Sequence, residues 1–238
     1  MAEAGLNETG GPPDQGDAPP PQDGTLLRRD SDGKPVERST YRDGRLDGTV
    51  VRYGPDGAVV TEIPFRSGRR DGRLVDYDEE GRPLAELTYR DGVLEGPAKL
   101  YRAGLPLLDA TYREGLLDGE VTSYDERGGL AMVAEYRRGR RHGTTTVYRP
   151  DGSILRKMEY RDDKLEGDTL DYDADGGLRT RTPYRSGLRD GVMVEYDGAG
   201  KAVRRTTFVG DRAAGPPAEG EKPSKPVREP WYQRLLSS

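Results

Sequence analysis

The 238-residue sequence contains no cysteine, one histidine, one tryptophan and two phenylalanines. Without cysteine the chain has no disulfide, no thiolate nucleophile and no thiolate ligand for a metal. The sequence also lacks the Gly-x-Ser-x-Gly, P-loop and HExxH patterns that mark common catalytic sites. We therefore expect a protein that is not an enzyme and that holds no cofactor or metal.

Long apolar runs and blocks of one charge are missing too. No stretch approaches the roughly 18 apolar residues of a membrane-spanning helix, and the first ten residues lack the basic and apolar regions of a signal peptide. The 38 basic and 43 acidic residues are interspersed and give a net charge of -5. This distribution argues against nucleic-acid binding and disfavours a membrane surface. We expect a cytoplasmic monomer without a thick core, because only 32% of residues are hydrophobic.

The sequence does contain an internal repeat with a period of 24 residues, shortened once to 23. Each unit has a lead aromatic followed by arginine, and half a period later a second tyrosine followed by a turn glycine. The lead aromatics are Tyr41, Phe65, Tyr89, Tyr112, Tyr136, Tyr160 and Tyr184. The second tyrosines are Tyr53, Tyr77, Tyr101, Tyr124, Tyr148, Tyr172 and Tyr196, and the turn glycines are Gly57, Gly81, Gly128, Gly152, Gly176 and Gly200. Such regularity indicates that each unit packs against the next.

Each unit reads as two strands. In Leu84–Arg90 the residues Ala85, Leu87 and Tyr89 share one face, and in Arg73–Tyr77 the side chain of Val75 lies beside Tyr77. The Pro-Asp-Gly connections are typical of hairpins, and the tight loop Gly92–Gly96 is too short for a parallel crossover. We therefore predict an all-β, elongated, single-layer antiparallel meander of about seven to eight hairpins and roughly sixteen strands. The tyrosine ladder should supply much of its stability through cross-strand contacts.

Composition divides the chain into four segments. Residues 1–25 are rich in proline and glycine and predict a disordered leader, whereas 26–215 hold the repeat array. Residues 216–228 read as a linker before a short amphipathic segment at 229–238. This segment gathers Trp231, Tyr232, Leu235 and Leu236, which we expect to form a short helix. It would dock on the last strand of the array or on a partner.

The repeat resembles the MORN family, and more closely the bacterial variant found in antitoxin-like proteins of the YwqK type. The residues that carry the resemblance in one unit are Gly143, Tyr148, Asp151, Gly152, Tyr160 and Gly167. In another unit they are Gly72, Tyr77, Gly81, Tyr89, Gly92 and Gly96. The resemblance covers about residues 29–215 and implies a single-layer repeat sheet with a binding or scaffolding role. The partner would be a protein, in the antitoxin subset a toxin encoded nearby; a lipid-binding or structural scaffold is the alternative.

Two columns of charge are the candidate binding surface. One consists of the arginines after the lead aromatics, which should line up about 10 Å apart; they are Arg42, Arg66, Arg90, Arg113, Arg137, Arg161 and Arg185. The other is an acidic loop series: Asp47, Asp71, Glu95, Asp118, Glu166 and Asp190. These columns are either a solvated surface with weak salt bridges or a long groove that reads an extended partner, with arginine and tyrosine as anchors.

Two other features suggest metal chemistry only superficially. His142 replaces an acidic residue of the loop series, which makes it a substitution in a solvated loop rather than a ligand. The Asp171–Gly176 stretch resembles the start of an EF-hand loop, but its twelfth position is Thr182 where a bidentate glutamate is needed. We therefore expect no calcium site there.

Overall fold

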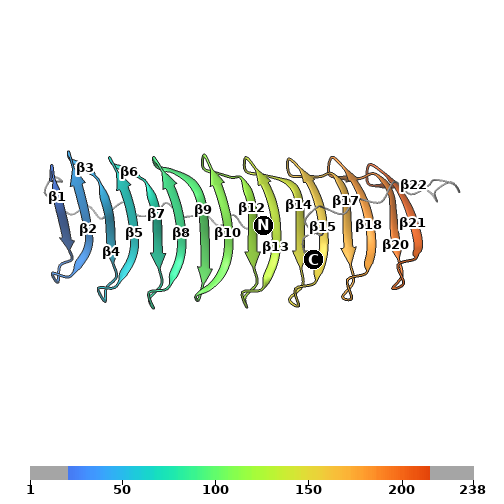
Figure 1. The fold of residues 1–238 in the computed structure, drawn as a ribbon, viewed down its shortest axis with the longest axis horizontal. Helices are drawn as coiled ribbons and strands as arrows, with labels where there is room; N and C mark the ends of the chain where they lie inside the picture. Colours follow the sequence, from blue (N-terminus) through green and yellow to red (C-terminus); the bar gives the residue numbers. More distant parts are fainter. Residues whose placement is uncertain (1–20, 215–238) are drawn as a thin grey trace, which may run out of the picture. The chain divides into compact units, whose positions relative to one another are not determined.

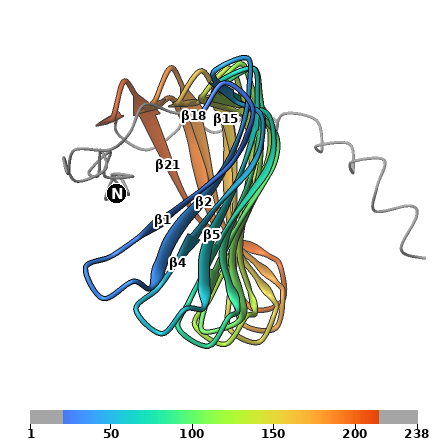
Figure 2. The same cartoon turned by 90° about the vertical axis from the view of Figure 1, so that its left-hand side faces the viewer.

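The computed structural model describes residues 21–214, and within that range every regular element is a β-strand. The chain divides into two compact units, Met1–Leu116 (unit 1) and Leu117–Ser238 (unit 2). Within each unit, neighbouring strands pair antiparallel and lie in one layer (Figures 1 and 2), with no second layer among the described residues. The prediction of an all-β antiparallel meander of hairpins is confirmed.

Unit 1 follows chain order from edge to edge. Its strands are β1 (Gly24–Arg29), β2 (Pro35–Arg42), β3 (Arg45–Leu46), β4 (Gly48–Tyr53), β5 (Val59–Arg66), β6 (Arg69–Arg70), β7 (Gly72–Tyr77), β8 (Pro83–Arg90), β9 (Val93–Arg102) and β10 (Leu105–Arg113). Where a short strand precedes a longer one, both pair with the same preceding strand: β3 and β4 with β2, and β6 and β7 with β5. Strand β1 begins two residues before the predicted boundary at 26. The reason is that the chain is already held against the first loop at these residues. Gly44 N donates a hydrogen bond to Gln22 O, and Asp43 N donates one to Asp23 Oδ1.

Unit 2 repeats the same pattern. Its strands are β12 (Gly119–Tyr124), β13 (Leu130–Arg137), β14 (Arg140–Tyr148), β15 (Ile154–Arg161), β16 (Lys164–Leu165), β17 (Gly167–Tyr172), β18 (Leu178–Arg185), β19 (Leu188–Arg189), β20 (Gly191–Tyr196), β21 (Ala202–Val209) and β22 (Arg212–Ala214). The two-residue strand β11 (Leu116–Leu117) falls at the boundary between the units. The predicted leader before residue 21 and the segment after 214, with Trp231, lie outside the described residues.

The hairpin ends that follow the lead aromatics form what we call the loop edge of each unit. Its turns are shorter than the predicted Gly92–Gly96 loop, because only Asp91 and Gly92 separate β8 from β9 and both have positive φ (50° and 86°). Two successive positive φ values define the type I′ turn, whose twist matches that of the flanking strands. The residues after the turn therefore return directly to strand, which adds the two-residue strands that the sequence analysis missed.

A further glycine follows each tight turn of the loop edge by four residues and plays a different role. Gly72 opens β7 with φ of 121°, and a Cβ built there would lie 3.0 Å from Cγ of Pro64. A side chain at this position would therefore be strained by its backbone and crowded by its neighbour. The glycine lets the chain step from the loop into the next strand.

The opposite hairpin ends carry the six turn glycines, which all have φ between 75° and 84°. Three of these glycines follow an aspartate, at Gly57, Gly152 and Gly176. A register shift accompanies every one of the six, as between Arg52 and Tyr53 opposite Val59–Thr61. Such a bulge increases local twist and re-aims side chains. The one shortened repeat has a two-residue turn instead, Ala103–Gly104, again with positive φ at both residues.

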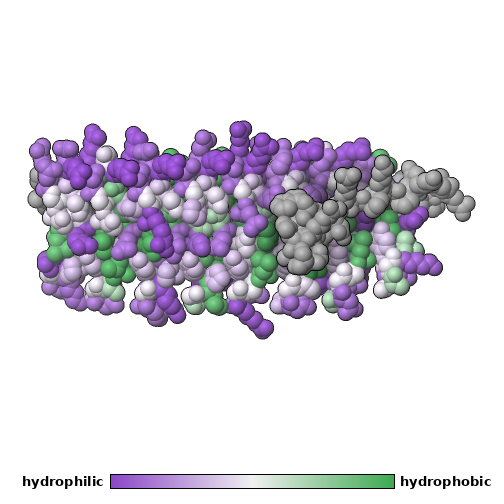
Figure 3. Space-filling model, in the orientation of Figure 1, coloured by the Kyte–Doolittle hydropathy of each residue, from purple (hydrophilic) through white to green (hydrophobic). Residues whose placement is uncertain are grey.

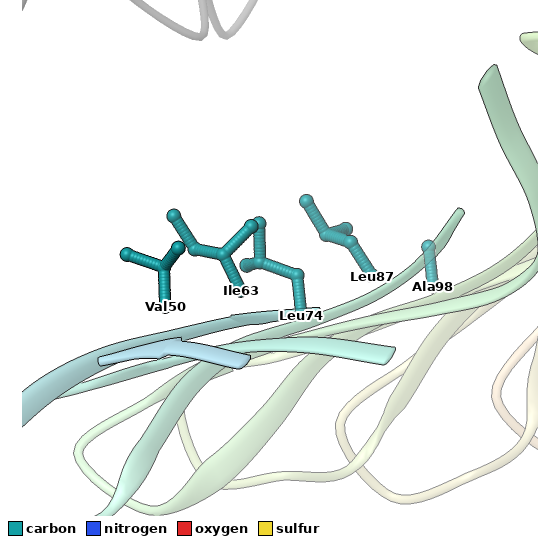
Figure 4. Close-up of a cluster of buried hydrophobic side chains, with 5 residues drawn as sticks. All are labelled: Val50, Ile63, Leu74, Leu87 and Ala98. Atoms are coloured by element: carbon teal, nitrogen blue, oxygen red, sulfur yellow. The ribbon is translucent and has the colours of Figure 1, made fainter. Parts of the chain in front are cut away.

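The main core cluster is a row of side chains across the strands at mid-length, on the face that carries the lead aromatics. In unit 1 it consists of Val50, Ile63, Leu74, Leu87 and Ala98 (Figure 4), which pair across neighbouring strands. The lead aromatics Phe65, Tyr89 and Tyr112, with Leu46 and Leu94, pack against this row and help to cover it. A single layer can thus bury residues to 9% exposure or less by shielding them with its own rings and aliphatic side chains. Val51 and Val75, at 3% and 6% exposure, are buried on the opposite face.

In unit 2 the same row becomes polar. Ala134 faces Thr145 across the β13–β14 pair, and Thr169 faces Thr182 across β17–β18, all of them buried. The hydroxyls of Thr145 and Thr169 find no hydrogen-bond partner in the described part of the chain. A buried polar group without a partner costs about 1–3 kcal/mol, so this row stabilises unit 2 less than the aliphatic row stabilises unit 1.

Thr145→Val should therefore stabilise unit 2. Valine has nearly the shape of threonine, and it would remove a hydroxyl whose side chain is only 2% exposed and has no partner. We expect the free energy of unfolding to rise by about 1 kcal/mol, as measured by urea denaturation. Thr144→Val is the matched control, because that hydroxyl donates to Glu159 Oε1 at 2.9 Å, and it should not stabilise. Equal effects of the two changes would contradict the argument.

Candidate protein-interaction edge

The arginines after the lead aromatics all lie on the loop edge of their unit and are exposed. The side chains of Arg42, Arg66 and Arg90 in unit 1 are 74%, 76% and 74% exposed. Arg185 in unit 2 is 75% exposed. Figure 3 shows hydrophilic side chains gathered along this edge of unit 1. The predicted column therefore exists within each unit as a row of projecting guanidinium groups, which we call the arginine row.

The acidic loop series points inward rather than outward. In unit 1, Asp47 Oδ2 accepts a hydrogen bond from Ser67 N at 3.0 Å, and Glu95 Oε2 accepts one from Glu114 N at 2.8 Å. In unit 2, Asp118 Oδ2 accepts from Arg138 N at 3.1 Å, and Glu166 Oε2 from Ser186 N at 2.8 Å. Each of these four carboxylates, and also Asp71 through Asp91 N at 3.3 Å, therefore clips its own loop to the backbone of the next repeat. We call these contacts carboxylate clips; they are charge-assisted and hence among the stronger hydrogen bonds.

Backbone hydrogen bonds reinforce the clips at every step. Gly68 N donates to Leu46 O at 2.7 Å, Gly92 N to Arg70 O at 2.7 Å, and Gly115 N to Leu94 O at 2.9 Å. The same pair of backbone atoms thus joins each loop of unit 1 to the next one. Consecutive loops are held in equivalent positions, which fixes the spacing of the arginine row.

The two charge columns therefore have different roles. Asp47, Asp71 and Glu95 have side chains only 15–26% exposed, and each lies 3.2–3.8 Å from the arginine of its own loop. An arginine carries five N–H donors, so one long contact leaves most of them directed to solvent. The carboxylates are used in cohesion between repeats, while the guanidinium groups remain accessible to a partner.

The clip is reversed where His142 replaces the acidic residue. Asp163, which replaces the usual loop glycine, accepts from Arg141 N at 2.9 Å through Oδ1 and donates its own N–H to Arg141 O at 3.0 Å. His142 Nδ1 lies 3.6 Å from Asp162 Oδ1 and has no hydrogen-bond partner among the described residues.

The same reversed clip joins Arg189 to Asp211, where Arg189 N donates to Asp211 Oδ1 at 2.9 Å and Asp211 N donates to Arg189 O at 2.9 Å. Because Asp190 is acidic there, the reversal goes with an aspartate at the second turn position rather than with the loss of the acidic loop residue.

Removing the reversed clip at Asp163 should destabilise unit 2. Asp163→Ala deletes the acceptor of Arg141 N and keeps the strained φ of 66°, so we expect a loss of about 1–2 kcal/mol in the free energy of unfolding. Asp163→Asn is the matched control, since asparagine tolerates positive φ and keeps an acceptor oxygen, and it should lose less than half as much. Urea denaturation of both variants makes the comparison; an equal loss would show that the hydrogen bond is not responsible.

The described residues offer no set of three or more histidine, aspartate or glutamate side chains that could hold a metal ion. In the Asp171–Gly176 stretch, Asp173 Oδ1 instead accepts hydrogen bonds from Asp175 N and Gly177 N. Its carboxylate thus shapes the turn. The described part of the chain also contains no helix long and apolar enough to cross a membrane.

The second tyrosines form a ladder of half-buried side chains at the other ends of the strands. Tyr77 Oη donates to Glu62 Oε2 at 3.1 Å, and burial together with this contact raises the pKa of Tyr77. Arg42 and the level of Tyr53 are about six residues apart along β2, or roughly 20 Å. The structure therefore does not place arginines and second tyrosines together as anchors of one groove.

The neighbouring strand brings up further cations that the sequence analysis did not single out. Arg45 and Arg69 pair with Arg42 and Arg66 across their turns, and Arg140 pairs with Arg137. Arg141 stacks over the Tyr160 ring at 4.2 Å from its centroid. The sequence indicates these cations by a second basic residue three positions after the lead arginine. A two-residue turn makes two residues at that spacing partners across the hairpin.

One acidic patch lies on the face opposite the lead aromatics in unit 2. Glu120 pairs with Glu135 across β12–β13, and Glu159 accepts from Thr144 Oγ1 at 2.9 Å. Partial desolvation, together with the charge of Glu135, raises the pKa of Glu159. This patch opposes in sign the arginine row of the same unit.

Each unit is thus a single-layer sheet of hairpin repeats with an ordered, polar loop edge. Extended repeat surfaces of this kind serve binding in many repeat proteins. Residues 141–162 match the sequence model of the family described as "MORN repeat variant". The other units carry glycines and tyrosines at equivalent positions and therefore resemble the unit that this family model matches. That similarity supports a role in protein or lipid interaction.

Comparison with individual proteins adds little. A search of the curated proteins found no match. Among solved structures, one described as "Crystal structure of GtfA/B complex bound to UDP and GlcNAc" shares 17% identity over 48% of this chain, with a TM-score of 0.22. The aligned part spans 22% of that structure's chain, and so low a TM-score carries no argument about function.

Proposed function

We propose that this protein is a non-enzymatic binding protein that engages a partner protein along the arginine row of its loop edge. The observation that carries the proposal is the division of roles on that edge. The carboxylates are directed into clips between repeats, whereas the guanidinium groups of Arg42, Arg66 and Arg90 project to solvent at 74–76% exposure. Arginine is also among the residues enriched in binding hot spots.

A narrower form of the proposal concerns the partner. The resemblance to YwqK-type proteins supports a role as the antitoxin or immunity partner of a toxin encoded nearby, with the protein acting as a cytoplasmic monomer. In that case the two proteins should form a tight one-to-one complex when they are produced together.

The test compares two triple variants of the full chain. Arg42, Arg66 and Arg90 are changed to serine in the row variant. Arg38, Arg102 and Arg127, which are exposed but lie away from the loop edge, are changed to serine in the control. The products of adjacent genes are produced with each tagged variant, and the size of the complex is measured by light scattering. Binding that weakens about thirtyfold in the row variant and by about threefold or less in the control, compared near the dissociation constant of the complex, supports the proposal. Equal binding by the two variants contradicts it.

A lipid surface is the competing function that the arginine row also favours. Binding to anionic vesicles would be electrostatic and would fall as salt is raised. Co-sedimentation with phosphatidylserine vesicles that requires the arginine row, without any protein complex, would replace the proposed function with lipid binding.

A further inference from the structure

We infer that the loop edge of unit 1 recognises an extended acidic segment in the polyproline II conformation, with a carboxylate side chain at every third residue. This inference rests on the proposed function and specifies the partner's chemistry. It follows from the spacing of the arginine row, from the availability of its donors and from the acidic side chains that separate its members.

The spacing of the row is set by strand geometry. Each lead arginine closes one hairpin, and two strands separate it from the next lead arginine in unit 1. Strands lie about 4.8 Å apart, so the repeat distance is roughly 9.6 Å. The identical backbone bonds from loop to loop, 2.7–2.9 Å long, hold this distance over three steps, from Arg42 through Arg66 and Arg90 to Arg113.

Few peptide conformations match that distance with side chains on one side. Three residues of polyproline II span about 9.3 Å and complete one turn, so every third side chain points the same way. Three residues of a β-strand span about 10 Å, but side chains three apart point to opposite faces. Seven residues of an α-helix span about 10.5 Å, an error of roughly 0.9 Å per step against 0.3 Å for polyproline II. Over three steps the helix falls almost 3 Å out of register.

Acidic residues in the turns of the loop edge disfavour a ligand that carries a negative charge at every residue. Asp43 and Asp91 occupy the first turn position beside Arg42 and Arg90, and Glu114 beside Arg113; all three are exposed. The loop of Arg66 has the uncharged Ser67 at this position. A ligand charged at every position would set carboxylates or phosphates against these acidic side chains. A ligand charged at every third position can place its anions on the guanidinium groups and uncharged residues at the turns. Repulsion thus contributes to specificity together with attraction.

The experiment uses fluorescein-labelled 15-residue peptides and the full chain. The first peptide repeats Pro-Pro-Glu five times, and the second has the same composition with its glutamates spaced irregularly by two and four residues. A third is an alanine-rich helical peptide with glutamate at every seventh position. We expect fluorescence anisotropy at low salt to give at least tenfold tighter binding for the first peptide than for either of the others.

The variants show where that preference originates. The row variant (Arg42, Arg66 and Arg90 to serine) should lose the preference for the regular peptide, and the control variant (Arg38, Arg102 and Arg127 to serine) should keep it. Equal affinity for regular and irregular peptides, a preference for the helical one, or a preference that survives in the row variant would overturn the inference. If the peptides show no preference while a native partner still requires the arginine row, the inference fails and the proposed function stands. If the partner ignores the row, the proposed function fails.

Discussion

Leu87→Ala is expected to lower the free energy of unfolding by about 2–4 kcal/mol, the largest single-residue effect that we predict for unit 1. Leu87 is 9% exposed and lies in the core row between Leu74 and Ala98, its partners on the two neighbouring strands. Truncation removes buried methyl groups and leaves a cavity. Because the sheet is a single layer, no side chains of a second layer can move in to fill that cavity. Urea denaturation followed by circular dichroism measures the loss.

Leu84→Ala in the same strand is the matched control. Leu84 is 40% exposed and points to the opposite face, so the change should cost less than about 0.5 kcal/mol. Comparable losses for the two leucines would mean that the row at mid-strand is not the core, and the account of how one layer buries its residues would be wrong.

The row variant is expected to bind the partner about thirtyfold more weakly than the unchanged protein. Three exposed charge contacts worth roughly 0.7 kcal/mol each amount to about 2 kcal/mol, and 1.4 kcal/mol is a factor of ten. The weakening should show mainly in slower association and in a shallower dependence on salt, since exposed charges steer the encounter. Surface plasmon resonance at two salt concentrations with the purified partner measures the association rate, the affinity and the dependence of both on salt.

The control variant defines the specific part of that loss. Replacing Arg38, Arg102 and Arg127 changes the net charge by the same three units, so it should reduce affinity only through the weaker overall field, by about threefold or less. If both variants lose the same affinity, the partner responds to net charge and the position of the arginines is irrelevant.

The repeat allowed the fold class to be predicted because strand, turn and face are local properties. The period of 24 identified the unit, and the Asp-Gly turns with alternating apolar residues such as Leu87 and Tyr89 specified antiparallel hairpins. The exposed arginines could be found in the same way, since Arg42 and its equivalents alternate with the lead aromatics. Local spacing suffices for all of these.

Features that depend on contact between repeats could not be found in this way. The acidic loop series looked like surface charge, because nothing local shows that Glu95 reaches the backbone of Glu114 in the next repeat. The reversed clip between Arg141 and Asp163 is visible only once both residues are placed side by side. The two-residue strands and the bulges beside the second tyrosines escaped detection for a related reason. Backbone dihedrals, rather than side-chain pattern, determine them.

The measurement that tests the account most directly is the unfolding free energy of Arg90→Ala compared with Glu95→Ala, because cohesion and recognition are assigned to these two neighbours separately. Arg90 is 74% exposed, whereas Glu95 is 26% exposed and accepts the N–H of Glu114 at 2.8 Å. We predict that Glu95→Ala lowers the unfolding free energy by about 1–2 kcal/mol and that Arg90→Ala changes it by less than about 0.5 kcal/mol. An equal or larger loss for Arg90→Ala would show that the arginine is part of the scaffold, and the proposed division of roles on the loop edge would be contradicted.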